Sequence, residues 1–256
     1  MLPYLKKHGV RPVGNQAGTA PGLPGPPTAT GATNDKNSQP PTGNKPCKEN
    51  LSSESAPLVF AQWNAEGLRN KKPELQNFLR NHKVDIICIQ ETHLTDAHRF
   101  FLRGYELFRH DRIHRHKGGL VTLVRNTIPA VQTFQSDNEG TEFLAVKVIL
   151  PDKEVTVINI YCPPDKDLQL HTIPMQEKGL LVAGDLNAHS PSWGYERLNT
   201  RGEQTEDWMM ENNLILINKP DDKPTCLSRA WKTSSHPDVA MATEDIQQQC
   251  ERNVED

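Results

Sequence analysis

The sequence lacks any apolar stretch approaching the roughly 20 residues that cross a bilayer, and its first residues lack the apolar core of a signal peptide. Its five cysteines form an odd set without a Cys-x-x-Cys spacing, which indicates neither a zinc site nor a disulfide framework. Reduced thiols are typical of the cytosol and the nucleus. We therefore expect a nuclear or cytoplasmic protein that is not secreted and has no membrane partner.

Proline and glycine are unevenly distributed and divide the chain in two. Residues 1–56 contain 9 of the 20 prolines and 7 of the 16 glycines, with few large apolar side chains. Such a segment cannot bury enough surface to offset its ordering entropy, so we predict a disordered tail over 1–56 and a folded domain over 57–256. The tail carries a formal charge of +3 and the remainder −6. An acidic domain needs a local basic patch or a metal to bind an anionic ligand.

Short apolar runs, each bounded by turn residues, follow the tail and are typical of strands buried on at least one face. The seven runs are Leu58–Trp63, Val84–Gln90, Gly119–Arg125, Thr141–Leu150, Glu154–Tyr161, Gly179–Ala183 and Leu214–Asn218. The short spacer Pro151–Lys153 predicts an antiparallel hairpin between two of them. Helices are predicted from Pro73 and from Thr200, where Thr200-x-x-Glu203 fits a capping box. Because strands outnumber helices, we expect packed sheets with helices outside.

Polar side chains recur where the predicted strands end. Six of them are Asn64, Glu91, Tyr161, Asp185, Asn187 and Asp238. Any one alone is typical of a cap or a turn, but strands that lie side by side bring their ends to one edge of a sheet. The group offers hard oxygen ligands and no thiolate or imidazole cluster, which favours Mg²⁺ over zinc.

Blocks of sequence around these positions carry a family resemblance. They are Gln62-Trp63-Asn64, Gln90-Glu91-Thr92, Asn159-Ile160-Tyr161, Gly184-Asp185-Leu186-Asn187-Ala188-His189 and Ser235-His236-Pro237-Asp238. In this order they resemble the endonuclease/exonuclease/phosphatase superfamily. The blocks Gln90–Leu94, Pro191–Gly194 and Asn199–Gly202 resemble the apurinic-type endonuclease domain of jockey-like non-LTR retrotransposons. The resemblance covers residues 58–256.

The resemblance implies a DNase I-like, four-layered α/β sandwich of two mostly antiparallel sheets with helices outside. It also implies a catalytic Mg²⁺, with Mn²⁺ as an alternative cation, held by Glu91 with help from Asn64. A hard divalent ion stabilises the charge that develops when a phosphodiester is hydrolysed.

The remaining residues of the blocks are given roles by the same resemblance. Asp185 is similar to the carboxylate that positions or deprotonates the attacking water, and Asn187 and Tyr161 resemble contacts to the scissile phosphate. Asp238 resembles an aspartate that orients a histidine near the end of the domain. Neutral donors bind phosphate without adding repulsion.

One element of the family pattern is missing. The family ends with a Ser-Asp-His block on a last strand, whereas this chain contains no Asp-His pair. Residues Cys250–Asp256 are polar and are predicted to form no strand, so we expect a domain truncated before its final strand. His236 precedes Asp238 by two residues and is interpreted as a loop histidine. We expect catalysis to be impaired.

A basic run, Arg109–Lys117, lies before the strand predicted from Gly119. Runs of this kind are usually solvated loops. The resemblance places such a loop near the DNA-binding rim, so Arg112, Arg115 and Lys117 are candidate phosphate contacts.

The hypothesis from the sequence is a Mg²⁺-dependent endonuclease domain that nicks target DNA and leaves a 3′-hydroxyl. Its partners would be DNA and a reverse transcriptase, on a downstream segment or a separate chain. Two alternatives stay open: an apurinic repair nuclease or phosphatase of the same superfamily, and a non-catalytic remnant that binds DNA.

Overall fold

The computed structural model describes residues 6–10, 57–112, 117–136, 140–228 and 233–254. The first sheet has the order β14 (Cys250–Val254), β1 (Lys6–Val10), β2 (Leu58–Asn64), β3 (Ile86–Gln90), β5 (Leu120–Arg125) and β4 (Tyr105–His110). The second has the order β10 (Leu214–Leu216), β13 (Asp238–Thr243), β9 (Leu180–Asp185), β8 (Glu154–Tyr161), β7 (Glu142–Ile149) and β6 (Ala130–Gln135). A small hairpin joins β11 (Cys226–Ser228) to β12 (Thr233–Ser235).

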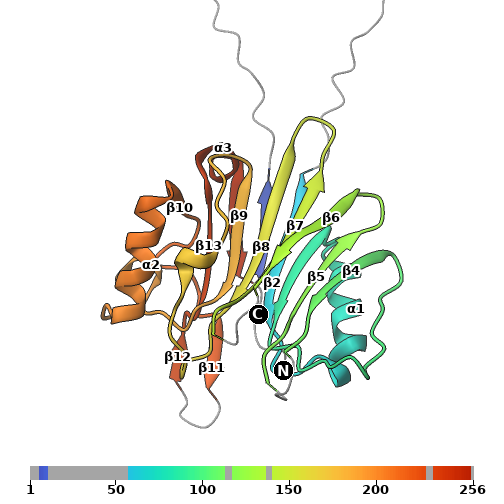
Figure 1. Ribbon diagram of the computed structural model, residues 1–256, viewed down its shortest axis with the longest axis horizontal. Helices are drawn as coiled ribbons and strands as arrows, with labels where there is room; N and C mark the ends of the chain where they lie inside the picture. Colours follow the sequence, from blue (N-terminus) through green and yellow to red (C-terminus); the bar gives the residue numbers. More distant parts are fainter. Residues whose placement is uncertain (1–5, 11–56, 113–116, 137–139, 229–232, 255–256) are drawn as a thin grey trace, which may run out of the picture. The chain divides into compact units, whose positions relative to one another are not determined.

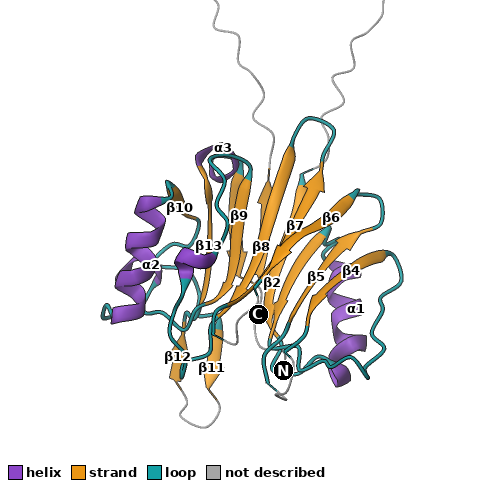
Figure 2. Cartoon of the chain, in the orientation of Figure 1, coloured by secondary structure: helices purple, strands orange, loops and turns teal. Residues whose placement is uncertain are grey.

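Helices are few in the described part of the chain. They are α1 (Lys72–Asn81), α2 (Thr200–Glu211) and the short α3 (Glu244–Gln247), with 3-10 turns at Arg69–Lys71, Leu170–Thr172 and Pro191–Trp193. None of the helices is long and apolar enough to cross a membrane. Figures 1 and 2 show α1 and α2 on opposite outer sides of the paired sheets.

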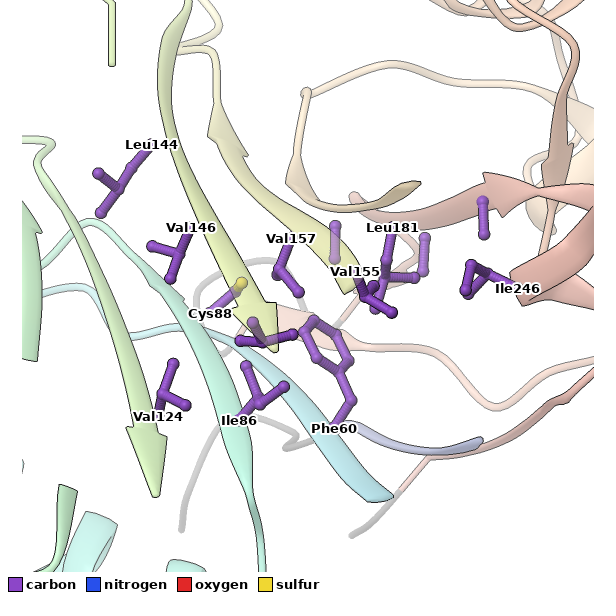
Figure 3. Close-up of a cluster of buried hydrophobic side chains, with 14 of the residues drawn as sticks. Phe60, Ile86, Cys88, Val124, Leu144, Val146, Val155, Val157, Leu181 and Ile246 are labelled. Atoms are coloured by element: carbon purple, nitrogen blue, oxygen red, sulfur yellow. The ribbon is translucent and has the colours of Figure 1, made fainter. Parts of the chain in front are cut away.

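Three apolar cores hold the layers together. The central core lies between the sheets, where Phe60 and Ile86 of the first sheet meet Val157 and Leu181 of the second (Figure 3). A second core packs α1 on the outer face of the first sheet, and a third packs α2 and its neighbouring loops on the outer face of the second. The arrangement confirms the expected four-layered α/β sandwich.

Strand directions also agree with the expectation of mostly antiparallel sheets. The pairs β2–β3 and β8–β9 are parallel, and the other pairs are antiparallel. The predicted hairpin joins β7 to β8, and its turn is closed by Leu150 N–H donating to the Lys153 carbonyl at 2.8 Å. The strands β4 and β6 were not among the predicted runs, because each is an edge strand with few buried side chains.

The prediction that Cys250–Asp256 forms no strand is wrong. Cys250–Val254 forms β14, which pairs with β1 and leaves its other edge without a partner strand in the described sheet. An edge strand is held by backbone hydrogen bonds and needs few apolar side chains, so its polar sequence concealed it. Its partner β1 lies within the range 1–56 that was predicted to be a tail.

The start of α2 differs by one residue from the expected capping box. The cap is Asn199, whose side-chain oxygen accepts hydrogen bonds from the Gly202 N–H at 2.7 Å and from the His189 N–H at 3.0 Å. Thr200 is the first helical residue and is exposed. Pro73 lies in the first turn of α1, as predicted.

We expect Asn199→Ala to lower the free energy of unfolding by about 1 kcal/mol or more, because two backbone N–H groups lose their acceptor. Thr200→Ala is the matched control and should change stability by less than about 0.5 kcal/mol, as surface substitutions usually do. Denaturant unfolding of the two variants measures the difference. Equal destabilisation would show that Thr200 contributes to the cap.

Candidate active site

Strand register brings the predicted polar residues to one edge of the sandwich. Asn64 ends β2 beside Gln90 of β3, so Glu91 follows at the same edge. In the second sheet, Asp185 at the end of β9 pairs with Tyr161 at the end of β8 and with Asp238 at the start of β13. The structure therefore gathers these side chains where the two sheets meet.

Asn64 connects the two sheets at this edge. Its amide nitrogen donates to Glu91 Oε1 at 2.8 Å and to Asp185 Oδ2 at 2.9 Å. The two carboxylates come from different sheets and are separated by 94 positions in the sequence. One amide group thus holds two carboxylates close together.

Two residues of the site have a backbone conformation that is unusual for residues other than glycine. Glu91 has φ +50° and Asn187 has φ +48°, and this left-handed region costs of the order of 1–3 kcal/mol for a residue with a Cβ. Local hydrogen bonds hold both turns. Gly67 N–H donates to the Glu91 carbonyl at 2.8 Å, and Asn187 N–H donates to Asp185 Oδ1 at 2.9 Å. Strain of this kind is typical of functional sites.

Asp185 is a buried carboxylic acid with a raised pKa. Burial and the neighbouring negative charge of Asp238 raise its pKa to about 7, and Glu91 adds a smaller effect in the same direction. Hydrogen bonds from Asn64 and Asn187 oppose the shift, because they stabilise the carboxylate. A carboxyl group that titrates near neutral pH can exchange a proton with water under physiological conditions.

Tyr161 and Asn187 supply neutral polar groups. Burial and the charge of Glu91 raise the pKa of Tyr161, so its hydroxyl stays protonated and remains a donor. The Asn187 side chain lies beside Asp185 and donates to the Cys162 carbonyl at 3.0 Å. Both groups can bind a phosphate oxygen without electrostatic repulsion.

Asp238 is held by an amide that the sequence did not assign a role. Gln62 Nε2 donates to Asp238 Oδ1 at 3.0 Å, and Gln62 Oε1 is buried with no partner in the described part of the chain. Below it, Gln90 Nε2 donates to Asn159 Oδ1 at 2.7 Å, again from one sheet to the other. Gln62 and Asp238 both lie within the sequence blocks, but nothing in the spacing of the blocks predicted their hydrogen bond.

Glu142 and Arg112 form a buried pair that sequence reasoning also missed. Arg112 Nε donates to Glu142 Oε1 at 2.6 Å, and Gly119 N–H donates to Glu142 Oε2 at 2.7 Å. The Arg112 side chain is only 9% exposed, so its guanidinium anchors a loop rather than facing solvent. Of the other candidate phosphate contacts, Lys117 is exposed and Arg115 lies outside the described residues.

His93 is a further neighbour of the site. Its Nε2 lies 3.5 Å from Glu91 Oε2, and its backbone has φ +52°. It belongs to the block Gln90–Leu94, which is the signal that could have found it.

The donor set fits a hard divalent cation. Two carboxylates share one amide NH₂ group, and burial together with the charges of Asp238 and Glu91 raises the pKa of Asp185, so a cation bound here would stabilise its ionised form. Among the described residues no three His, Cys, Asp or Glu side chains are grouped as a complete ligand set. A cation here would take Glu91 and the Asn64 amide oxygen as protein ligands and keep several waters, as Mg²⁺ commonly does.

Known proteins share both sequence and structure with this chain. A probable RNA-directed DNA polymerase from the Drosophila melanogaster transposon X-element is 27% identical over 175 residues, covering 66% of this chain and 19% of that protein. The RNA-directed DNA polymerase from mobile element jockey of the same species is 26% identical over 156 residues, covering 59% and 17%. The chain thus spans about a fifth of the length of these curated relatives.

A solved structure has a fold similar to that of this chain. The endonuclease domain of TRAS1, a telomere-specific non-LTR retrotransposon, has a TM-score of 0.64 and 25% identity, covering 75% of this chain and 88% of that chain. The family model for the Endonuclease/Exonuclease/phosphatase family matches residues 61–240. Because that match covers most of the chain, the protein belongs to the endonuclease/exonuclease/phosphatase family.

Proposed function

We propose that this chain is a divalent-metal-dependent DNA endonuclease domain of a non-LTR retrotransposon, which nicks target DNA and leaves a 3′-hydroxyl. The observation that carries the proposal is the Asn64 amide between Glu91 and Asp185 at the edge where the sheets meet. The similarity to the TRAS1 endonuclease domain supports DNA as the substrate.

The proposed chemistry assigns each group a task. Asp185 accepts a proton from the attacking water, for which a pKa near neutrality is well matched. The Tyr161 hydroxyl and the Asn187 amide donate to the non-bridging phosphate oxygens. Glu91 and Asn64 would hold Mg²⁺ or Mn²⁺, which would supply positive charge to stabilise the phosphoryl and leaving oxygens.

The proposed role of Asp238 is to orient a histidine, and the sequence contains no Asp-His pair that would supply one. We infer that the 256-residue chain nicks slowly. The names of the curated relatives, which are RNA-directed DNA polymerases, support a reverse transcriptase as the partner that extends the 3′-hydroxyl. A chain that nicks chromosomal DNA would act in the nucleus.

Extending the chain through a strand that carries Ser-Asp-His should raise its rate of nicking by about 10²–10⁴, because the extension supplies a positioned acid or base. Nicking of supercoiled plasmid with Mg²⁺ measures this rate, and EDTA should abolish it. An extension with Ser-Ala-Ala in place of Ser-Asp-His is the control. Equal nicking by the unextended chain would contradict the assignment of Asp238.

In the extended chain, Glu91→Gln and Asp185→Asn should each lower the nicking rate by at least about 10², through loss of a metal ligand and of the base. The exposed residues Glu177 and Asp207 provide matched controls, Glu177→Gln and Asp207→Asn, which should retain the parent rate. Unchanged nicking in both site variants would disprove the proposed function. DNA binding without cleavage in every variant would favour a non-catalytic remnant instead.

The raised pKa of Asp185 predicts a pH dependence of stability when metal is removed by EDTA. The folded chain keeps this proton up to about pH 7, whereas the unfolded chain releases it near pH 4, so the stabilising contribution is complete below pH 4 and is lost as the pH rises through about 7. Denaturant unfolding at pH 5 and pH 8 should show a larger loss for the parent chain than for Asp185→Asn. Identical losses would mean that Asp185 is ionised throughout.

A further inference from the structure

A cavity with a strongly positive lining lies beside α1, away from the catalytic edge. Its volume is about 670 Å³, and its lining includes Arg80, Lys83, Arg103 and Arg125 but no Asp or Glu. Residues 57–256 carry a formal charge of −6, whereas the lining of this cavity carries four cationic side chains. The local charge favours an anionic ligand.

One face of α1 forms a wall of this cavity. Pro73, Gln76, Asn77 and Arg80 line it at helical spacing, whereas Leu75 and Phe78 on the other face are buried against the first sheet. The cavity therefore opens on the outer side of the sandwich, where α1 lies beside β4 and β5 (Figure 1).

Part of the cavity is fixed by its own hydrogen bonds. Arg125 donates to Asp85 Oδ1 and to the Val84 carbonyl, both at 2.7 Å, and its guanidinium lies 5.6 Å from the centre of the Tyr105 ring. The Tyr105 hydroxyl donates to the same carbonyl at 2.5 Å. A charged group and an aromatic ring are thus held side by side. Asp85 balances Arg125, which leaves the exposed Arg80, Lys83 and Arg103 as the unbalanced charges of the lining.

Aromatic side chains extend this surface toward the start of α1. Phe101 is 70% exposed, and the Lys72 ammonium lies 4.1 Å from the centre of its ring and 5.7 Å from that of Phe100. In the sequence Arg99-Phe100-Phe101-Leu102-Arg103, two basic residues flank the aromatic pair, and Leu102 and Arg103 line the cavity. Exposed aromatic rings among cations are the combination that binds unpaired bases and phosphates.

The surface is separate from the proposed catalytic edge. Tyr105 pairs with Arg125 at the end of β5, and the neighbouring Val124 pairs with Ile86 at the start of β3. Glu91 follows the other end of β3, which puts the cavity about one strand length, roughly 16 Å, away.

We propose that the surface formed by the α1 cavity and the neighbouring side chains of Phe100 and Phe101 binds single-stranded nucleic acid. The cations contact successive phosphates, and the rings of Tyr105 and Phe101 stack on bases. A duplex fits poorly, because its bases are already stacked and paired and cannot meet these rings. The proposal does not depend on the nicking activity, since no residue of the surface belongs to the catalytic cluster.

The test measures binding of the 256-residue chain to fluorescent 12-nucleotide RNA and DNA strands of one sequence, and to the corresponding DNA duplex, by fluorescence anisotropy in EDTA. The double variant Lys83→Glu/Arg103→Glu should bind the single strands at least about tenfold more weakly and reduce the salt slope by about 1.4, because two phosphate contacts are lost. The double variant Lys178→Glu/Lys219→Glu changes the net charge equally at other exposed positions and should bind like the parent.

Phe101→Ser gives an independent readout. It should weaken single-strand binding at least about fivefold and leave the salt slope unchanged, because it removes stacking and not charge. Tighter binding of RNA or of DNA, or equal binding of both, identifies the strand and supports the proposal. Equal weakening by both charge-reversal pairs, or parent-like binding of the Lys83/Arg103 and Phe101 variants, would overturn it. Tighter binding of the duplex than of the single strands would also overturn the proposal. Circular dichroism of each variant checks that it is folded.

Discussion

The contact on which the rest of the site depends is the Asn64 amide between Glu91 and Asp185. Apolar contacts between two sheets are non-directional and leave some freedom in how polar groups at the edge are placed. Buried hydrogen bonds between the sheets remove that freedom, because each misplaced polar group would lose its partner in a low dielectric. The bond from Gln90 to Asn159 does the same below the site, so the two halves of the site are fixed relative to each other.

The same contact accounts for the electrostatics of the edge. Asp185 is buried next to Asp238 and close to Glu91, so ionising all three would place like charges together with little solvent. Burial is the largest cause of the raised pKa of Asp185 and the charge of Asp238 is the next, while hydrogen bonds from Asn64 and Asn187 offset part of the shift. An edge that retains excess negative charge is suited to a divalent cation and needs neutral groups for any contact to phosphate.

How much could be predicted depended on whether a feature is local in sequence. Strands β3 and β9 are buried along their whole length, and β8 is buried after its first residue, so all three were evident as apolar runs. The series of polar residues at their ends was evident too. The edge strands β4, β6 and β14 mix apolar and polar residues, so no apolar run in the sequence marked them. Contacts between sheets depend on the register of distant segments, and therefore Gln62 with Asp238 could not be foreseen.

The sequence alone also does not show which basic residues are available to bind a ligand. Arg112 stands in the most basic run of the sequence, yet it is used to neutralise Glu142, which lies 30 residues later and is 1% exposed. Charge density along the sequence thus measures the number of cations and not their availability to a ligand. Availability is set by burial and by partners, and on this criterion the exposed Lys83 and Arg103 are better placed to meet an anion than Arg112. Within the basic run, the paired Arg112 is therefore a weaker candidate for an anion contact than the exposed Lys117.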